Sequence, residues 1–268
     1  MIDHGKKNLL GIGIDAVDYE AAVARIISAA ERRKAYGVSA LAVHGVMTGV
    51  LDREHCYRLN QLELVVPDGQ PVRWGLNLLH KTQLPDRVYG PTLTLKVCEA
   101  AAQHGVKIFL FGSSEETLEK LSNNLLHQFP GIQIAGMQPS AFRTLTQQER
   151  DALVDTIRQS GAEITLVGLG CPRQEIWAFE NRDRLSMPVM AVGAAFAFHA
   201  GQLSQAPPWM QDRGLEWLYR LVAEPGRLWK RYLFLNPLYL LLLALQWSRL
   251  LTLQSSRGEI PNEEVRYG

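Results

Sequence analysis

Short apolar runs alternate with longer amphipathic stretches over roughly the first 200 residues of this chain. This alternation is typical of βαβ units, in which parallel strands form a sheet and helices cover both of its faces. We predict six strands, at residues 38–44, 62–66, 107–112, 132–137, 163–170 and 188–193. The pattern therefore predicts an α/β fold with a mostly parallel sheet.

Helix start signals lie between the predicted strands. Ser113 with Glu116, and Thr146 with Glu149, have the spacing of capping boxes, in which each side chain bonds a backbone N–H of the other residue. Pro172 suits a first helical position because the N–H that it lacks has no helical partner there. These signals predict a helix after each of three strands.

The character of the chain changes after Pro207 and Pro208. Residues 207–254, which we call the appendage, are rich in Trp, Leu and Arg, show no strand pattern, and are predicted to be helical with breaks at Pro225 and Pro237. We place a domain boundary near residue 206. The polar residues 255–268 are predicted to be disordered.

The composition of the chain limits the classes of protein to which it can belong. An apolar fraction of 47% in 268 residues is enough for a large core, and a formal charge of +1 gives no general attraction to nucleic acid. The three cysteines lack Cys-x-x-Cys spacing, and the N-terminus lacks the apolar segment of a secretory signal. We therefore expect a cytoplasmic protein.

Known metal and cofactor motifs are missing from the sequence. No two histidines have metal-ligand spacing, and neither Asp-x-Asp nor the glycine patterns of dinucleotide or P-loop sites occur. We expect no bound metal and no cofactor. A phosphate leaving group would need another source of positive charge.

Several glycines follow predicted strands directly and precede helix starts. Such turns bind phosphate through helix N–H groups, or serve only tight packing between strand and helix, and the glycines alone support both interpretations equally. The residues concerned are Gly112, Ser113, Gly168, Gly170, Pro172 and Gly193.

Arginines in the appendage could supply the positive charge. Arg213 and Arg220 are seven residues apart and so share one face of a helix, and Arg227, Lys230 and Arg231 follow the break at Pro225. The guanidinium fork suits phosphate oxygens. A solvated face, or a face that binds anionic lipid headgroups, is the alternative.

The apolar run at residues 232–247 would form a helix of about 24 Å, shorter than the roughly 30 Å of a bilayer core. Basic residues precede it and aromatic residues flank it. We predict that it lies in the interface of an anionic membrane leaflet. A contact within a homo-oligomer is the competing interpretation.

Asp68 stands in Pro-Asp-Gly, directly after the strand at residues 62–66. The tripeptide alone favours a turn, because Asp side chains bond nearby backbone N–H groups. Its position favours a role in an active site, since active-site residues of open α/β sheets collect at the carboxyl ends of strands. The predicted strands bring His44 and Cys171 to the same edge.

Several segments together closely resemble the WecG/TagA/CpsF family of bacterial glycosyltransferases. They include VVPDG, DRVYGPTL, IFLFGSSEET, LVGLGCPRQE and the stretch around GLEWLYRLVAEPGRLWKRYL, within residues 9–245. The resemblance implies a Rossmann-like, GT-E-like domain with a helical appendage that completes the site. It also implies inverting, metal-independent transfer of a sugar from a UDP-sugar to a polyprenyl-diphosphate-linked acceptor at the inner membrane face.

The resemblance also assigns roles to residues of this chain. Asp68 corresponds to the general base, and Arg87 and Gln174 occupy active-site positions of the family. Substrate contacts are predicted, beyond the glycine turns above, at Gly69, Gly90, Thr92, Arg173, Arg213, Arg220, Arg227 and Arg231.

Two stretches depart from the family pattern. Residues 42–44 read Ala-Val-His where many members have Thr-x-Asn, and residues 89–92 read Tyr-Gly-Pro-Thr where an acid is common. These departures put the usual N-acetylmannosamine donor in question, and His44 could assist Asp68 or serve the structure alone. A non-catalytic membrane-surface adaptor is the alternative function, and a nicotinamide oxidoreductase is remote because its glycine fingerprint is missing.

Overall fold

The computed structural model describes the backbone of residues 1–268 and all side chains except those of Arg227, Lys230 and Arg231. Its centre is a six-stranded sheet in the order β4-β3-β8-β7-β5-β6, with every neighbouring pair parallel. The strands are β3 (Tyr36–Leu41), β4 (Leu64–Pro67), β5 (Lys107–Gly112), β6 (Gln133–Gln138), β7 (Ile164–Gly168) and β8 (Pro188–Ala191). The predicted α/β class and all six predicted strands are confirmed, with ends shifted by a few residues.

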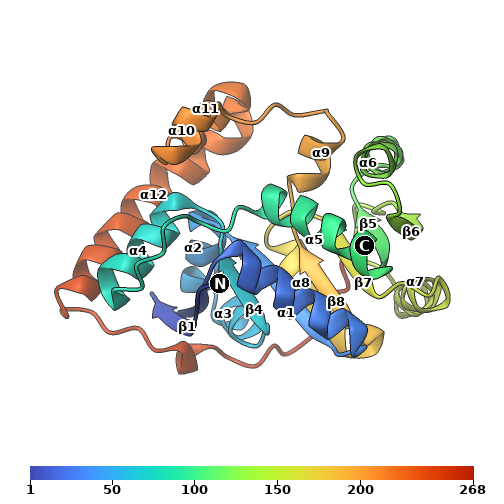
Figure 1. Cartoon of the computed structure of the whole chain (residues 1–268). Helices are drawn as coiled ribbons and strands as arrows, with labels where there is room; N and C mark the ends of the chain where they lie inside the picture. Colours follow the sequence, from blue (N-terminus) through green and yellow to red (C-terminus); the bar gives the residue numbers. More distant parts are fainter.

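Helices cover both faces of the sheet (Figure 1). One apolar cluster joins the sheet to α1 (Tyr19–Glu31), α5 (Gly90–His104), α6 (Glu115–Gln128) and α9 (Ala195–His199). The other face packs on α2 (Val43–Leu51), α3 (Arg53–Asn60), α4 (Gln70–His80), α7 (Gln147–Gln159) and α8 (Arg173–Leu185). The central strands are buried on both sides, which explains why they read as continuous apolar runs.

A hairpin of β1 (Asp3–Leu9) and β2 (Ile12–Val17) precedes this sheet, and the sequence analysis did not predict it. Its turn residues, Leu10 and Gly11, both have positive φ, as a two-residue hairpin turn requires. Leucine is an unusual residue for such a turn, so the usual signal is absent. The hairpin lies beside the edge strand β4, where the buried carboxylate of Asp15 accepts a hydrogen bond from the Val65 N–H at 2.8 Å.

Two of the three predicted helix starts differ from the structure by one residue. The capping box of Thr146 and Glu149 is confirmed at the start of α7. Ser114 caps α6 in place of Ser113, whose backbone lies in the left-handed region with φ of 61°. Pro172 is the N-cap of α8 and not its first residue.

The appendage forms α10 (Pro208–Asp212), α11 (Glu216–Ala223) and α12 (Pro225–Trp247). The predicted break at Pro237 is wrong, because α12 continues through this residue. Proline removes one helical hydrogen bond, but packing of the following turns supports the helix: Tyr239 and Leu243 are buried in the core, and the Tyr239 hydroxyl donates to the Pro71 carbonyl at 2.8 Å. In the chain as described, no helix combines the length and apolarity needed to cross a membrane.

Residues 255–268, expected to be disordered, lie along the α/β domain in the structure. The N–H groups of Val265 and Arg266 donate to the Glu180 carboxylate at 2.7 and 3.1 Å. The Leu145 N–H donates to the Arg266 carbonyl at 2.8 Å. Glu180 and Leu145 are distant from the tail in sequence and bond mainly its backbone groups. The polar composition of the tail therefore did not indicate these contacts.

Candidate active site

A cavity of about 260 Å³ lies at the carboxyl ends of β3, β4, β7 and β8, and α11 and α12 close its far side. This is the edge where open α/β sheets bind their ligands. Eight of the residues predicted for the site line it: His44, Asp68, Gly69, Arg87, Gly170, Gln174, Gly193 and Arg220.

Asp68 follows β4 directly and is held from both sides. Its N–H donates to the Leu41 carbonyl at 3.2 Å, and its carboxylate accepts a hydrogen bond from the Gly90 N–H at 2.5 Å. Gly90 is the first residue of α5, where backbone N–H groups have no helical partner. A Cβ at Gly90 would lie 3.0 Å from the Ala40 Cβ and 3.2 Å from the Asp68 carboxylate, so glycine permits this close approach.

The surroundings of Asp68 favour its neutral form. Burial raises the pKa of the Asp68 carboxyl to about 6, and the negative charge of Glu216 adds to this rise. Arg87, the Gly90 N–H and Arg220 act in the opposite direction and lower the pKa. The carboxyl is therefore mostly ionised at pH 7 but can still take up a proton, as a general base requires.

Glu216 of α11 connects the appendage to this edge of the sheet. Its carboxylate forms an ion pair with Arg87 at 2.8 Å and accepts a hydrogen bond from the Tyr89 hydroxyl at 3.1 Å. The Arg87 guanidinium lies 4.1 Å from the centre of the Tyr89 ring and also donates to Gln211 at 3.1 Å. Burial, followed by the charge of Glu216, raises the pKa of Tyr89, so its hydroxyl stays protonated and continues to donate.

Arg220 lies one turn after Glu216 and also lines the cavity. Its guanidinium is 5.9 Å from the centre of the Phe198 ring. Among the side chains that the structure describes, no carboxylate lies within 4.0 Å of it, whereas Arg87 is paired with Glu216. Arg220 therefore presents a positive charge that a bound anion can meet.

Gln174 supports the turn after β7. Its amide oxygen accepts from the Gly170 N–H at 3.1 Å, and its amide nitrogen donates to Glu175 at 2.9 Å. Gly193, with φ of 56°, lies against this amide, and a Cβ there would come within 3.1 Å of it. Both ends of the Gln174 amide are thus engaged within the protein.

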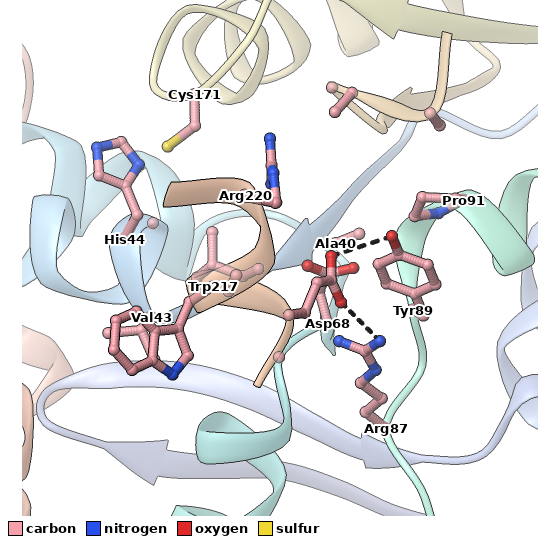
Figure 2. A pocket seen from close by; sticks show the side chains of 18 of the residues that line it. Ala40, Val43, His44, Asp68, Arg87, Tyr89, Pro91, Cys171, Trp217 and Arg220 are labelled. Carbon is pink, nitrogen blue, oxygen red and sulfur yellow. Dashed lines mark hydrogen bonds and ion pairs between the residues drawn. The ribbon is translucent and has the colours of Figure 1, made fainter. Parts of the chain in front are cut away.

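His44 is near the start of α2, and the sequence analysis considered it as a partner of Asp68. Figure 2 shows it apart from Asp68, on the side of the cavity where Cys171 lies. The structure therefore does not bring these two side chains together.

Other predicted residues lie outside the cavity. Ser113 and Arg173 line a second hollow of about 230 Å³ beyond β7. A Cβ at Gly112 would meet the Gly168 backbone at 2.9 Å, and a Cβ at Gly168 would meet the Phe196 ring at 2.6 Å, so close packing requires glycine at both positions, and at Gly112 its φ of 104° requires it as well.

Of the remaining predicted positions, Arg213 lies over the Trp209 ring, 5.8 Å from its centre. Thr92 and Pro172 lie beside the cavity and not among its lining residues. The side chains of Arg227 and Arg231 are outside the described residues.

The sequence analysis missed Glu216 and the Tyr89 hydroxyl. A signal for Glu216 existed, because it is the acid four residues before Arg220 on one face of an otherwise apolar helix. Tyr89 was noted only as a departure from a family pattern. No local signal connects it to Glu216, which is 127 residues away.

Together the sheet edge, the buried carboxyl of Asp68 and the arginine that lines the cavity identify this cavity as the candidate active site of an α/β enzyme. Residues 7–252 match the model of the glycosyl transferase WecG/TagA/CpsF family. The match spans most of the chain, so the protein belongs to this family and is a glycosyltransferase. The resemblance noted in the sequence is confirmed, and the alternative of a non-catalytic adaptor is set aside.

Proposed function

We propose that this glycosyltransferase moves a sugar from a UDP-sugar to a polyprenyl-diphosphate-linked sugar, with inversion and without a metal ion in the transfer step. The observation that carries the proposal is Asp68, which is fixed at the cavity by backbone groups and has a pKa of about 6. The family membership supplies the reaction class. The donor, the acceptor and the mechanism are parts of the proposal.

In the proposed step, a hydroxyl of the acceptor sugar gives its proton to Asp68 as its oxygen attacks the anomeric carbon of the donor. The bond from that carbon to the diphosphate breaks on the opposite face, and UDP leaves. A single in-line displacement inverts the anomeric configuration. General-base help of this kind contributes roughly 10²- to 10⁴-fold in rate.

The departing diphosphate needs positive charge, and Arg220 is the described side chain best placed to supply it. It lines the cavity, whereas the charge of Arg87 is already engaged by Glu216. Preorganised cationic and N–H donors stabilise such leaving groups.

The exposed face of α12 supports a membrane location. Leu233, Phe234, Leu240 and Leu241 are each 57–64% exposed. We propose that this face lies in the interface at the inner side of the plasma membrane, where a lipid-linked acceptor is found. Binding of the chain to anionic vesicles, measured by co-sedimentation, should weaken in the variant Leu240→Ser with Leu241→Ser. Unchanged vesicle binding together with dissociation of an oligomer would favour the homo-oligomer contact instead.

The activity is tested with a panel of UDP-sugars and a bacterial lipid extract. We expect one donor to be consumed, with a sugar product on the lipid, and the same donor to raise the midpoint of thermal unfolding. The departures at residues 42–44 and 89–92 make a panel necessary, since they stand near the expected sugar pocket. If no donor is consumed and none shifts the midpoint, the proposed substrate class is wrong.

A further inference from the structure

Three metal-ligating side chains meet beneath the cavity wall, outside the charged groups around Asp68. They are His55 of α3, Cys171 before α8, and Glu175 in the first turn of α8. One ligand atom from each, an imidazole nitrogen, the thiol sulfur and a carboxylate oxygen, lies within 4.8 Å of the other two. Cys171 and Glu175 also line the cavity.

Two of these side chains are buried with polar atoms that have no partner in the described protein. His55 is 1% exposed, and neither of its ring nitrogens has a hydrogen bond. Glu175 is also 1% exposed, and its Oε2 has no hydrogen bond. Buried polar atoms without a hydrogen bond are destabilising, and a cation bound between the two side chains would give one ring nitrogen of His55 and Oε2 of Glu175 a shared partner.

The other carboxylate oxygen is held in place. Oε1 of Glu175 accepts from the Gln174 amide at 2.9 Å and from the Ser39 hydroxyl at 3.3 Å. These donors fix the carboxylate, and a cation would replace the hydrogen bond that the Cys171 thiol makes to Glu175. Outer hydrogen bonds that orient a ligating carboxylate are typical of protein metal sites.

The ligand set and the spacing suit a borderline-soft divalent cation. Nitrogen, sulfur and carboxylate oxygen are the donors that Zn²⁺ uses, at about 2.0–2.3 Å from the ion. Tetrahedral bonds of that length place ligand atoms roughly 3.3–3.6 Å apart, and the three ligand atoms, all within 4.8 Å of one another, need to move little to reach these distances around an ion. Three protein ligands leave one position open.

We propose that His55, Cys171 and Glu175 form a binding site for one divalent cation of the Zn²⁺ type. No metal was expected from the sequence, because spacing rules recognise ligands that are close in the chain and His55 comes from a separate helix. The site takes no part in the transfer step proposed above, so each proposal can fail without the other. A bound ion would join α3 to the cavity wall at Cys171.

The test measures metal binding by the full chain after dialysis against a chelator. We expect one Zn²⁺ per chain, a raised unfolding midpoint with Zn²⁺, and a thiolate-to-cobalt charge-transfer band when Co²⁺ is added instead. Cys171→Ser should remove the band and weaken Zn²⁺ binding by more than about 100-fold. His55→Gln should weaken binding similarly. Cys98→Ser is the matched control, since Cys98 is a buried thiol of the other apolar cluster and should leave binding unchanged.

X-ray absorption of the Zn²⁺-loaded native protein provides a measurement that needs no variant. The expected spectrum contains one sulfur neighbour at about 2.3 Å and lighter neighbours near 2.0 Å. Absence of Zn²⁺ binding by the native chain would overturn the proposal, and a buried water would then remain as the partner of His55. Binding that survives in Cys171→Ser, or a spectrum without sulfur, would overturn it equally.

Discussion

The two walls of the candidate active-site cavity are built in different ways. The wall from the sheet consists of strand ends in which every residue of β4 is buried, and backbone hydrogen bonds hold Asp68 in place. The wall from the appendage comes from α11, which has no buried residue, and from α12, which reaches the core through Leu228, Tyr239 and Leu243. The first wall is part of the core, whereas the second touches the core through a few side chains.

The sheet wall and the appendage wall therefore have different roles in the proposed reaction. The sheet fixes the position of the carboxyl that we propose as the base, and α11 sets its electrostatic surroundings. Glu216 raises the pKa of Asp68, whereas Arg220, one turn later, lowers it. Docking of α11 thus brings two opposite charges to the cavity. If this interpretation holds, changes in the sheet wall should abolish chemistry, and changes in the appendage should shift its rate and pH dependence.

The largest effect is expected from Asp68→Asn. The amide cannot accept the proton of the acceptor hydroxyl, so kcat should fall by about 10²- to 10⁴-fold. The affinity for the UDP-sugar, measured by calorimetry, should change little. Asp155→Asn serves as a control because Asp155 is an exposed acid of α7 outside the cavity. A near-native kcat in Asp68→Asn would rule out Asp68 as the base.

The same variant gives a stability test whose sign follows from the pKa. Because the folded-state pKa of about 6 lies above the ordinary value of 3.8, the folded state holds a proton that the unfolded state has lost between these pH values. Native stability contributed by this group is therefore lost as pH rises from about 4 through 6. Asp68→Asn should lack this loss, so its unfolding midpoint at pH 7.5 should equal or exceed that of the native protein.

The next largest effect is expected from Arg220→Ala. Removing a cation that stabilises the leaving diphosphate should lower kcat by about 100-fold. Arg213→Ala is the matched control, because Arg213 lies on the same helical appendage but over the Trp209 ring and outside the cavity. Its kcat should stay within about twofold of native. Equal losses in both variants would mean that the appendage arginines act together and that the cavity does not distinguish them.

Much of the fold could be predicted because its signals are local. The six strands are continuous apolar runs, and a capping box marks the start of α7. The hairpin was missed because its turn uses Leu10, and the run of α12 through Pro237 was missed because long-range packing overrides a local breaker. Each failure concerns a feature that depends on contacts distant in the chain.

The residues of the candidate site, too, could be predicted only where their signal is local in the sequence. Asp68 could be located because it follows a strand and because strand ends meet at one edge. The pairing of Arg87 with Glu216 spans two parts of the chain and could not be read from either. The two glycines of the β5 and β7 ends look alike in sequence to phosphate-binding turns, and only the distances to the Gly168 backbone and the Phe196 ring show that they pack.

A smaller effect, mainly on pH dependence, is expected from Glu216→Gln. Removing this negative charge lowers the pKa of Asp68 below about 6, because Glu216 raises it. A base works in its deprotonated form, so the acid limb of the kcat/KM profile should move to lower pH. The plateau should fall by roughly tenfold, about the value of one charge-assisted hydrogen bond. Asp212→Asn, an exposed acid of α10, should leave the limb in place. A limb that moves to higher pH would contradict the role given to Glu216.

The smallest effect is expected from Tyr89→Phe, which removes only the hydroxyl that donates to Glu216 at 3.1 Å. The Arg87 pair with Glu216 remains, so docking of α11 should persist and kcat/KM should fall by about fivefold, the value of one hydrogen bond of roughly 1 kcal/mol. Tyr219→Phe is the control, since its hydroxyl bonds Ser204 at an exposed position of the same helix. The measurement is steady-state kinetics of the two variants. A loss of kcat/KM in Tyr89→Phe alone means that the hydrogen bond from Tyr89 helps to hold α11 in place. Equal kcat/KM values in the two variants mean that α11 keeps its place without this hydrogen bond.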